Sequence, residues 1–264
     1  MDTYTHGHAD AVLQSHRWRT VENSAGYLLP HLRPGLAVLD VGCGPGTITV
    51  DLARRVAPGR VVGLDVPPAP LDEARALAAS SGVAVEFAVG DVYDLDVPDG
   101  TFDVVHAHQV LQHLTDPVAA LRELARVTRP GGLVAVRDVD YATFTWFPLD
   151  PGLDRWLELY YGVARRNDAE PDAGRRLLAW AHAAGLRDVT ATTSAWCYAT
   201  PAEREWWGNS WAGRATASSF AEQALSYGLA TADELDAIAD AWRRWRDADD
   251  GWLSMTHGEL LVRV

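Results

Sequence analysis

The chain has 264 residues, 48% of them hydrophobic, and a formal net charge of −13 at pH 7. This size and apolar content support an α/β domain with a substantial core, and the acidic balance disfavours nucleic acid and anionic membranes as partners. All 23 basic residues are arginines, which excludes Schiff-base and P-loop chemistry because both need a lysine.

The first half of the chain alternates between two patterns. Residues 8–29 have apolar positions at helical spacing and predict a helix that ends at Pro30. Apolar runs typical of buried parallel strands then alternate with helical patterns. The predicted strands are 37–42, 60–66, 83–91, 101–110 and 133–139, and the predicted helices between them are 47–56, 70–82 and 116–132. This alternation predicts right-handed crossovers and a doubly wound, Rossmann-like α/β sheet.

After Asp140 the composition changes, because ten of the 11 tryptophans follow this residue. The patterns predict helices over 154–166 and 173–185, a strand over 188–200, a helical block over about 202–247 and a final strand over 252–264. Because no repeat or linker interrupts the chain, we expect a single domain. Its expected parts are an N-terminal helical lid (1–30), a cofactor-binding core (31–140), helical cap insertions (141–170 and 201–250) and the final strand (251–264).

The segment VLDVGCGPGT (38–47) predicts a strand that ends in a glycine-rich turn, which is typical of a nucleotide site. The dinucleotide pattern G-x-G-x-x-G is not met, because Thr47 stands at the position of its third glycine. Asp40 lies two residues before the first glycine, where its carboxylate would repel a pyrophosphate. The turn therefore favours a cationic ligand without phosphate, such as S-adenosylmethionine (SAM), with Gly42, Gly44 and Gly46 allowing close backbone approach.

Two further acids follow the next predicted strands. Asp65 ends the second strand and Asp91 follows the third, so both are expected at the edge of the sheet where ligands bind. With these residues in place, 36–138 resemble the class I SAM-dependent methyltransferases, in particular those of ubiquinone and menaquinone biosynthesis and of natural-product pathways. The matching stretches are VLDVGCGPGTIT, GLDVPPAPLDEAR and the run from GDVYDL to GGLVAV.

The resemblance implies a role for each matching position. Asp40 and the turn from Gly42 to Gly46 would hold the methionine part of SAM, Asp65 with Val66 the ribose and adenine, and Asp91 with Val92 the adenine. Gln109 would add a contact after the fourth strand. The chain departs from the family at Pro67 and Pro70, where a serine and a methionine are usual. The family fold has seven strands with the last one antiparallel, which fits the final predicted strand.

Methyl transfer requires alignment of the acceptor and, for many acceptors, removal of a proton, so no fixed catalytic motif is expected. His113 after the fourth strand and Asp138 at the end of the fifth are the candidate catalytic residues. The alternative for His113 is a packing or capping role at the start of the next helix. The N-terminal cluster of Tyr4, His6, His8, His16 and Arg19 is expected on a lid over the SAM pocket. Its histidines are not expected to form a metal site, because no cysteine or carboxylate completes a ligand set.

The tryptophan-rich helices allow two interpretations. Trp206, Trp207 and Trp211 lie within two helical turns, and Trp242 and Trp245 are three residues apart. They either pack the two helices together or form a homodimer contact, or they cover an apolar substrate.

The sequence therefore predicts a SAM-dependent methyltransferase that acts on O, C or N of a small, largely apolar molecule in specialised metabolism. The alternatives are a SAM-binding protein that catalyses a cyclisation or decarboxylation, and an NAD(P) oxidoreductase. The expected partner is a small molecule, with no nucleic acid, membrane or metal. Two cysteines and the lack of a signal peptide or an 18-residue apolar run predict a cytoplasmic protein.

Overall fold

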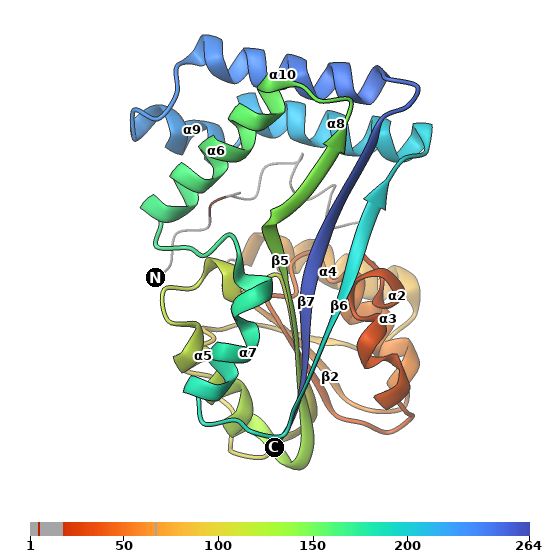
Figure 1. Ribbon diagram of the computed structural model, residues 1–264. Helices are drawn as coiled ribbons and strands as arrows, with labels where there is room; N and C mark the ends of the chain where they lie inside the picture. Colours follow the sequence, from red (N-terminus) through yellow and green to blue (C-terminus); the bar gives the residue numbers. More distant parts are fainter. Residues whose placement is uncertain (1–4, 6–17, 67) are drawn as a thin grey trace.

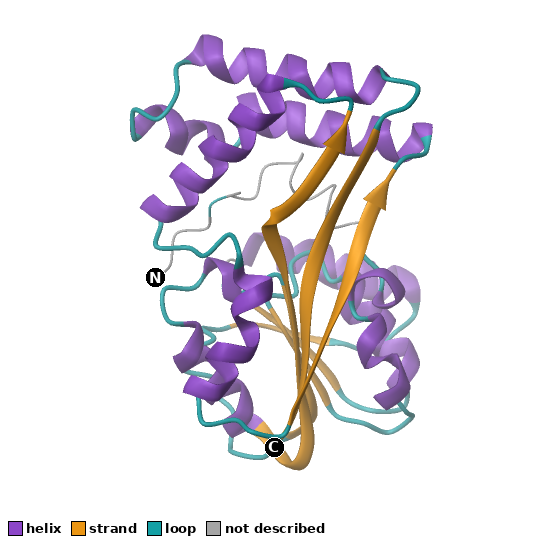
Figure 2. Cartoon of the chain, in the orientation of Figure 1, coloured by secondary structure: helices purple, strands orange, loops and turns teal. Residues whose placement is uncertain are grey.

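The computed structural model describes residues 5, 18–66 and 68–264 and contains a seven-stranded sheet with helices on both faces (Figures 1 and 2). The strand order is β3-β2-β1-β4-β5-β7-β6. Strands β1 to β5 pair in parallel, and β7 is antiparallel to both β5 and β6. The strands are β1 (Val38–Val41), β2 (Val61–Asp65), β3 (Glu86–Val89), β4 (Phe102–His108), β5 (Thr128–Phe147), β6 (Val189–Tyr198) and β7 (Trp252–Arg263). The predicted Rossmann-like, doubly wound sheet is confirmed.

Two layers of helices cover the α/β body because neighbouring strand residues point to opposite faces of the sheet. Val38 packs in one apolar cluster with α2, η1 and α3, whereas Leu39 packs in another with α5 and α7. The helices are α2 (Val21–Ser24), the 3₁₀ helix η1 (Gly26–His31), α3 (Thr47–Val56), α4 (Pro68–Ser81), the 3₁₀ helix η2 (Leu111–His113), α5 (Pro117–Val127), α6 (Pro151–Arg166), α7 (Ala173–Ala183), α8 (Pro201–Thr216), α9 (Ser219–Ser226) and α10 (Ala232–Asp247).

Strand β5 is much longer than predicted. It continues to Phe147, and its upper part pairs with the start of β7, where Thr145 faces Ser254 and Phe147 faces Trp252. The predicted helical insertion over 141–170 is therefore wrong over 141–147, which are strand, and α6 forms most of the remainder. Together β5, β7 and β6 rise from the body toward the helices above it (Figure 1).

The upper helices α6, α8, α9 and α10 form a cap at the top of these three strands (Figure 1). Both α8 and α10 begin with capping boxes, Thr200 with Glu203 and Thr231 with Glu234. An apolar cluster that includes Trp156, Trp211 and Trp242 fills the space between the cap helices. The cap therefore has its own core, separate from the two cores of the α/β body.

The single helix predicted over 8–29 is wrong where the chain is described. Residues 18–31 contain the short α2 and the 3₁₀ helix η1, separated at Ala25, whose φ of −140° is not helical. Gly26 follows directly, and glycine has a low helix propensity. Pro30 lies inside η1 rather than ending a helix. The lid residues Tyr4, His6, His8 and His16 lie outside the described residues.

Strand β3 is less buried than its apolar sequence suggested. Glu86, Ala88 and Val89 are exposed because β3 is an edge strand of the sheet. Within the described ranges, no helix has the length and apolar content needed to cross a bilayer.

Candidate active site

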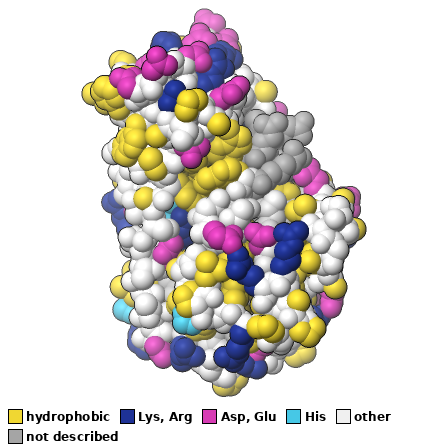
Figure 3. All heavy atoms as spheres, turned by 90° about the vertical axis from the view of Figure 1, so that its right-hand side faces the viewer, with side chains coloured by type: hydrophobic (Ala, Val, Ile, Leu, Met, Phe, Trp, Pro, Cys, Tyr) yellow, Lys and Arg dark blue, Asp and Glu magenta, His cyan; other side chains and the backbone are white. Residues whose placement is uncertain are grey.

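A cavity of about 340 Å³ lies beyond the carboxyl ends of β1, β2 and β4 and extends to the cap. β1 lies between β2 and β4, so the strand order reverses beside it, which is where open α/β sheets bind ligands. One face of the molecule shows hydrophobic side chains gathered between the cap and the α/β body (Figure 3). The cavity therefore connects the predicted cofactor turn with the tryptophan-rich helices.

The glycine turn adopts a backbone that other residues rarely accept. Gly42, Gly44 and Gly46 have φ values of +68°, +53° and +79°. A Cβ on Gly42 would lie 2.4 Å from Cγ2 of Val110, and a Cβ on Gly46 would lie 2.8 Å from Cβ of Ala74. Gly42 and Gly44 line the cavity, whereas Gly46 precedes α3 and is not part of the lining.

Asp40 lines the cavity but its carboxylate also holds the fold together. Its Oδ2 accepts a 2.6 Å hydrogen bond from Thr49 Oγ1 of α3, and its Oδ1 lies 2.7 Å from His106 Nδ1 of β4. The side chain is 4% exposed. Asp40 therefore places a fixed negative charge in the cavity wall while joining three elements.

Asp65 links the end of β2 to the glycine turn. Its Oδ2 accepts from the Gly44 N–H at 2.7 Å and its Oδ1 from the Val66 N–H at 2.8 Å. Asp91 accepts from the Tyr93 N–H at 3.0 Å. Asp65, Val66, Asp91 and Val92 all line the cavity. Pro70 lies in the lining as well, and Pro67 is outside the described residues.

Gln109 has a φ of +54° and lines the cavity directly after β4. Its Oε1 accepts a 2.6 Å hydrogen bond from Arg19, and its Nε2 donates to His257 Nε2 at 2.9 Å. Because both ends of the amide are bonded, Gln109 fixes Arg19 and β7 at the cavity. Its predicted contact with the cofactor stays a prediction.

The two predicted catalytic residues occupy different places. His113 lines the cavity, where burial and the charge of Arg19 lower its pKa to about 3. Gln112 Nε2 lies 2.9 Å from His113 Nε2, and an amide nitrogen only donates, so this imidazole lone pair is already used. Asp138 is fully buried, accepts from the Gln112 N–H at 3.2 Å and does not line the cavity. Burial raises its pKa to about 7.

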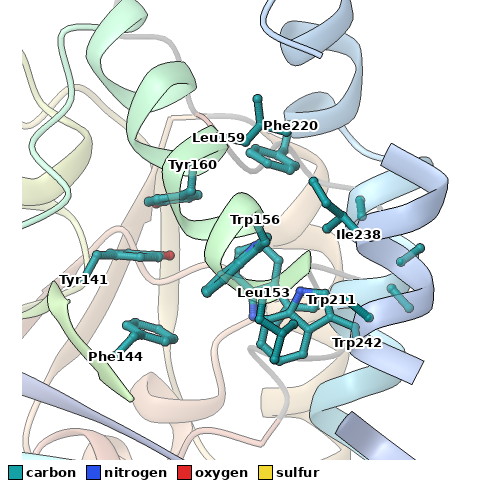
Figure 4. Packing of buried hydrophobic residues seen from close by; sticks show 14 of the residues in the cluster. Tyr141, Phe144, Leu153, Trp156, Leu159, Tyr160, Trp211, Phe220, Ile238 and Trp242 are labelled. Carbon is teal, nitrogen blue, oxygen red and sulfur yellow. The ribbon is translucent and has the colours of Figure 1, made fainter. Parts of the chain in front are cut away.

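The cap end of the cavity is aromatic. Tyr141 stacks on Tyr160 at 3.9 Å and on Phe144 at 4.8 Å, and Figure 4 shows Tyr141 and Phe144 beside the tryptophan cluster. Trp207 and Trp211 line the cavity. Trp242 and Trp245 do not, and they pack α10 into the cap core instead. Trp206 is half-buried against Trp18 at 5.4 Å.

Several residues that line the cavity were not identified as site residues from the sequence. They come from the end of β4, the strands β6 and β7 and helix α8, and they are His108, Trp196, Arg214 and Met255. The position of His108 at the end of a predicted parallel strand was a usable signal. The others depend on how distant segments meet above the sheet.

The chemistry of the lining fits the predicted cofactor. Asp40, Asp65 and Asp91 provide carboxylates at or just after the ends of three adjacent strands, and the glycine turn provides a surface free of side chains. Such a set suits a ligand that has a positive charge and hydroxyl groups but no phosphate. Among the described residues, no group of three or more His, Cys, Asp or Glu could hold a metal ion.

Residues 39–136 match the family model described as a methyltransferase domain. The chain is 36% identical to an uncharacterized methyltransferase, C1B3.06c, of Schizosaccharomyces pombe, over 98% of this chain and 96% of that protein. It is 27% identical to the probable methyltransferase ltbC of Aspergillus luteorubrus, over 99% and 97%. The YcgJ protein of Bacillus subtilis has a similar fold, with a TM-score of 0.60 and 19% identity over 92% of this chain and 98% of that chain.

The full-length relationship to a methyltransferase agrees with the glycine turn, the strand-end carboxylates and the seven-stranded sheet. The methyl donor of this family is SAM. The chain belongs to the SAM-dependent methyltransferases.

Proposed function

We propose that this enzyme methylates O, C or N of a small, largely apolar molecule in specialised metabolism. The observation that supports this proposal is the continuous cavity, with carboxylates and the glycine turn at one end and Tyr141, Phe144, Trp207 and Trp211 at the other. Aromatic walls favour flat, apolar ligands, and an apolar lining limits the water around the reacting groups.

In this proposal the methionine part of SAM lies at Asp40 and the turn from Gly42 to Gly46. Asp65 with Val66 binds the ribose and adenine, Asp91 with Val92 binds the adenine, and Gln109 borders the site. The contacts that support these roles are the Asp65 bond to the turn and the lining positions of all these residues except Gly46. The SAM sulfonium supplies an activated methyl group. The chain must then align the acceptor and exclude water.

Calorimetry with S-adenosylhomocysteine and with NADH tests the cofactor site. We expect binding of S-adenosylhomocysteine and none of NADH. Incubation with methyl-labelled SAM and a panel of phenols, indoles and quinones then tests the reaction. Label in at least one apolar aromatic acceptor would support the proposal.

Binding of S-adenosylhomocysteine without transfer to any panel member would favour the cyclisation or decarboxylation alternative. A homodimer and a cytoplasmic location stay predictions from the sequence. Sedimentation velocity measures the first, and fractionation of the producing cells measures the second.

A further inference from the structure

His108 is a cavity residue that neither the sequence motifs nor the roles above use. It is the last residue of β4, lines the cavity and is 5% exposed. His106 lies two residues earlier on the same strand face, but its Nδ1 is bonded to Asp40 and it does not line the cavity. The pleat of β4 thus places His106 under the glycine turn and His108 at the ligand edge of the sheet.

The imidazole of His108 differs from the other buried imidazoles. Neither Nδ1 nor Nε2 of His108 has a hydrogen-bond partner. By contrast, His113 accepts from Gln112 and His257 accepts from Gln109, both through Nε2 at 2.9 Å. Among the buried histidines of the described chain, His108 therefore combines a place in the cavity lining with a lone pair that no protein group occupies. A buried polar group of this kind requires an explanation.

The surroundings of His108 keep its ring neutral. Burial, followed by the charges of Arg19 and Arg137, lowers its pKa well below 6.5, and His257 and His106 add smaller effects in the same direction. The Trp196 ring lies 5.6 Å from the imidazole and the His257 ring 6.2 Å. A neutral imidazole in this place has one nitrogen that can accept a proton at pH 7.

We propose that His108 is a catalytic residue that accepts the proton which the methyl acceptor loses. The proposal rests on the function proposed above and narrows the substrate to acceptors that carry a removable proton, such as a phenol, an alcohol or an N–H group. The acceptor lone pair forms the new bond to the methyl carbon while the carbon–sulfur bond breaks and its electron pair goes to sulfur. The acceptor proton moves to the free imidazole nitrogen of His108 and later to solvent.

The charge balance of this step suits the site. The positive charge lost at sulfur equals the one gained on the imidazole, so the total charge facing Arg19 and Arg137 does not change. Methylation also makes the acceptor proton strongly acidic, so a base of low pKa can remove it. The low pKa that burial imposes on His108 is therefore compatible with its role.

The test compares the intact enzyme with His108→Ala and His108→Asn, using the panel acceptor that takes up label from SAM. We expect turnover to fall by roughly a hundredfold in both variants, which is typical of the loss of a general base. Affinity for S-adenosylhomocysteine, measured by calorimetry, should stay within about twofold. Added imidazole should restore turnover in His108→Ala, because the ring fits the space that the substitution leaves.

The pH profile and the controls separate this role from a structural one. In His108→Asn, turnover should rise with pH up to the pKa of the acceptor, whereas the unmodified enzyme stays nearly flat. His182→Ala, an exposed histidine of α7, is the matched control and should keep full turnover.

Three outcomes would overturn the proposal: turnover within threefold in folded His108→Asn, rescue by imidazole in His113→Ala instead of His108→Ala, or a tenfold loss of S-adenosylhomocysteine affinity. If the unmodified enzyme transfers no label while binding S-adenosylhomocysteine, the proposed function has failed instead.

Discussion

Oδ1 of Asp40 lies 2.7 Å from Nδ1 of His106, and the second oxygen of the same carboxylate accepts from Thr49. All three side chains are buried. These two contacts thus join β1 to β4 and to α3 directly beneath the glycine turn. One of the carboxylates that line the cavity thus also fixes the elements around it.

Thr49→Val tests whether the hydrogen bond from Thr49 to Asp40 stabilises the fold. The substitution keeps the shape of the side chain but leaves Asp40 Oδ2 buried without its donor, which should lower the free energy of unfolding by about 2 kcal/mol. Urea denaturation measures the change. Thr193→Val, at an exposed position of β6, is the matched control and should stay within about 0.5 kcal/mol. An equal effect in both variants would show that the Thr49 bond contributes nothing specific.

Much of this arrangement could be predicted because its determinants are local. The strand period and the glycine spacing determine where Asp40, Asp65 and Asp91 lie relative to the sheet edge. The extension of β5 could not be predicted, because residues such as Phe147 pair with Trp252, which lies more than a hundred positions away. The lack of a hydrogen-bond partner at His108 could not be predicted either, because it depends on which side chains from distant elements fail to reach its ring.

Acid should destabilise the fold. The pKa of His108, His113 and His257 is lowered by burial, so below about pH 6.5 the unfolded chain binds protons that the folded chain does not. Asp138 acts in the opposite direction, because burial raises its pKa from 3.8 to about 7. Between these two pH values the folded chain binds a proton on Asp138 that the unfolded chain has lost. The three histidines together outweigh Asp138, so the free energy of unfolding falls as the pH decreases.

We expect the free energy of unfolding to drop by on the order of 1–3 kcal/mol per pH unit between pH 6 and pH 4. Urea denaturation at a series of pH values measures this slope. His257→Gln should make it shallower, whereas His182→Gln on the surface should not change it. A slope of zero in this range would contradict the burial of uncharged imidazoles.

Gly42→Ala tests the close approach at the turn. The new Cβ would lie 2.4 Å from Val110, so the turn must shift where it lines the cavity. We expect the affinity for S-adenosylhomocysteine to fall by at least roughly tenfold in calorimetry, about 1.4 kcal/mol.

Gly82→Ala is the matched control for that substitution. Gly82 has a similar φ of +66°, but nothing lies within 4 Å of its Cβ position. Backbone strain is therefore common to both variants and only Gly42→Ala has the steric clash. Equal affinities in the two variants would mean that the clash is relieved without moving the turn.

Trp207→Leu and Trp242→Leu separate the two roles of the tryptophans. Trp207 lines the cavity and stacks on Tyr198 at 4.5 Å, whereas Trp242 is fully buried 4.9 Å from Trp156 and outside the lining. Trp207→Leu should raise the KM for an aromatic acceptor roughly tenfold and leave S-adenosylhomocysteine affinity unchanged, because an aromatic wall is lost. Trp242→Leu should instead lower the free energy of unfolding by about 2–4 kcal/mol with KM within twofold. Steady-state kinetics and urea denaturation measure the two effects, and an unchanged KM in Trp207→Leu would assign that residue to packing alone.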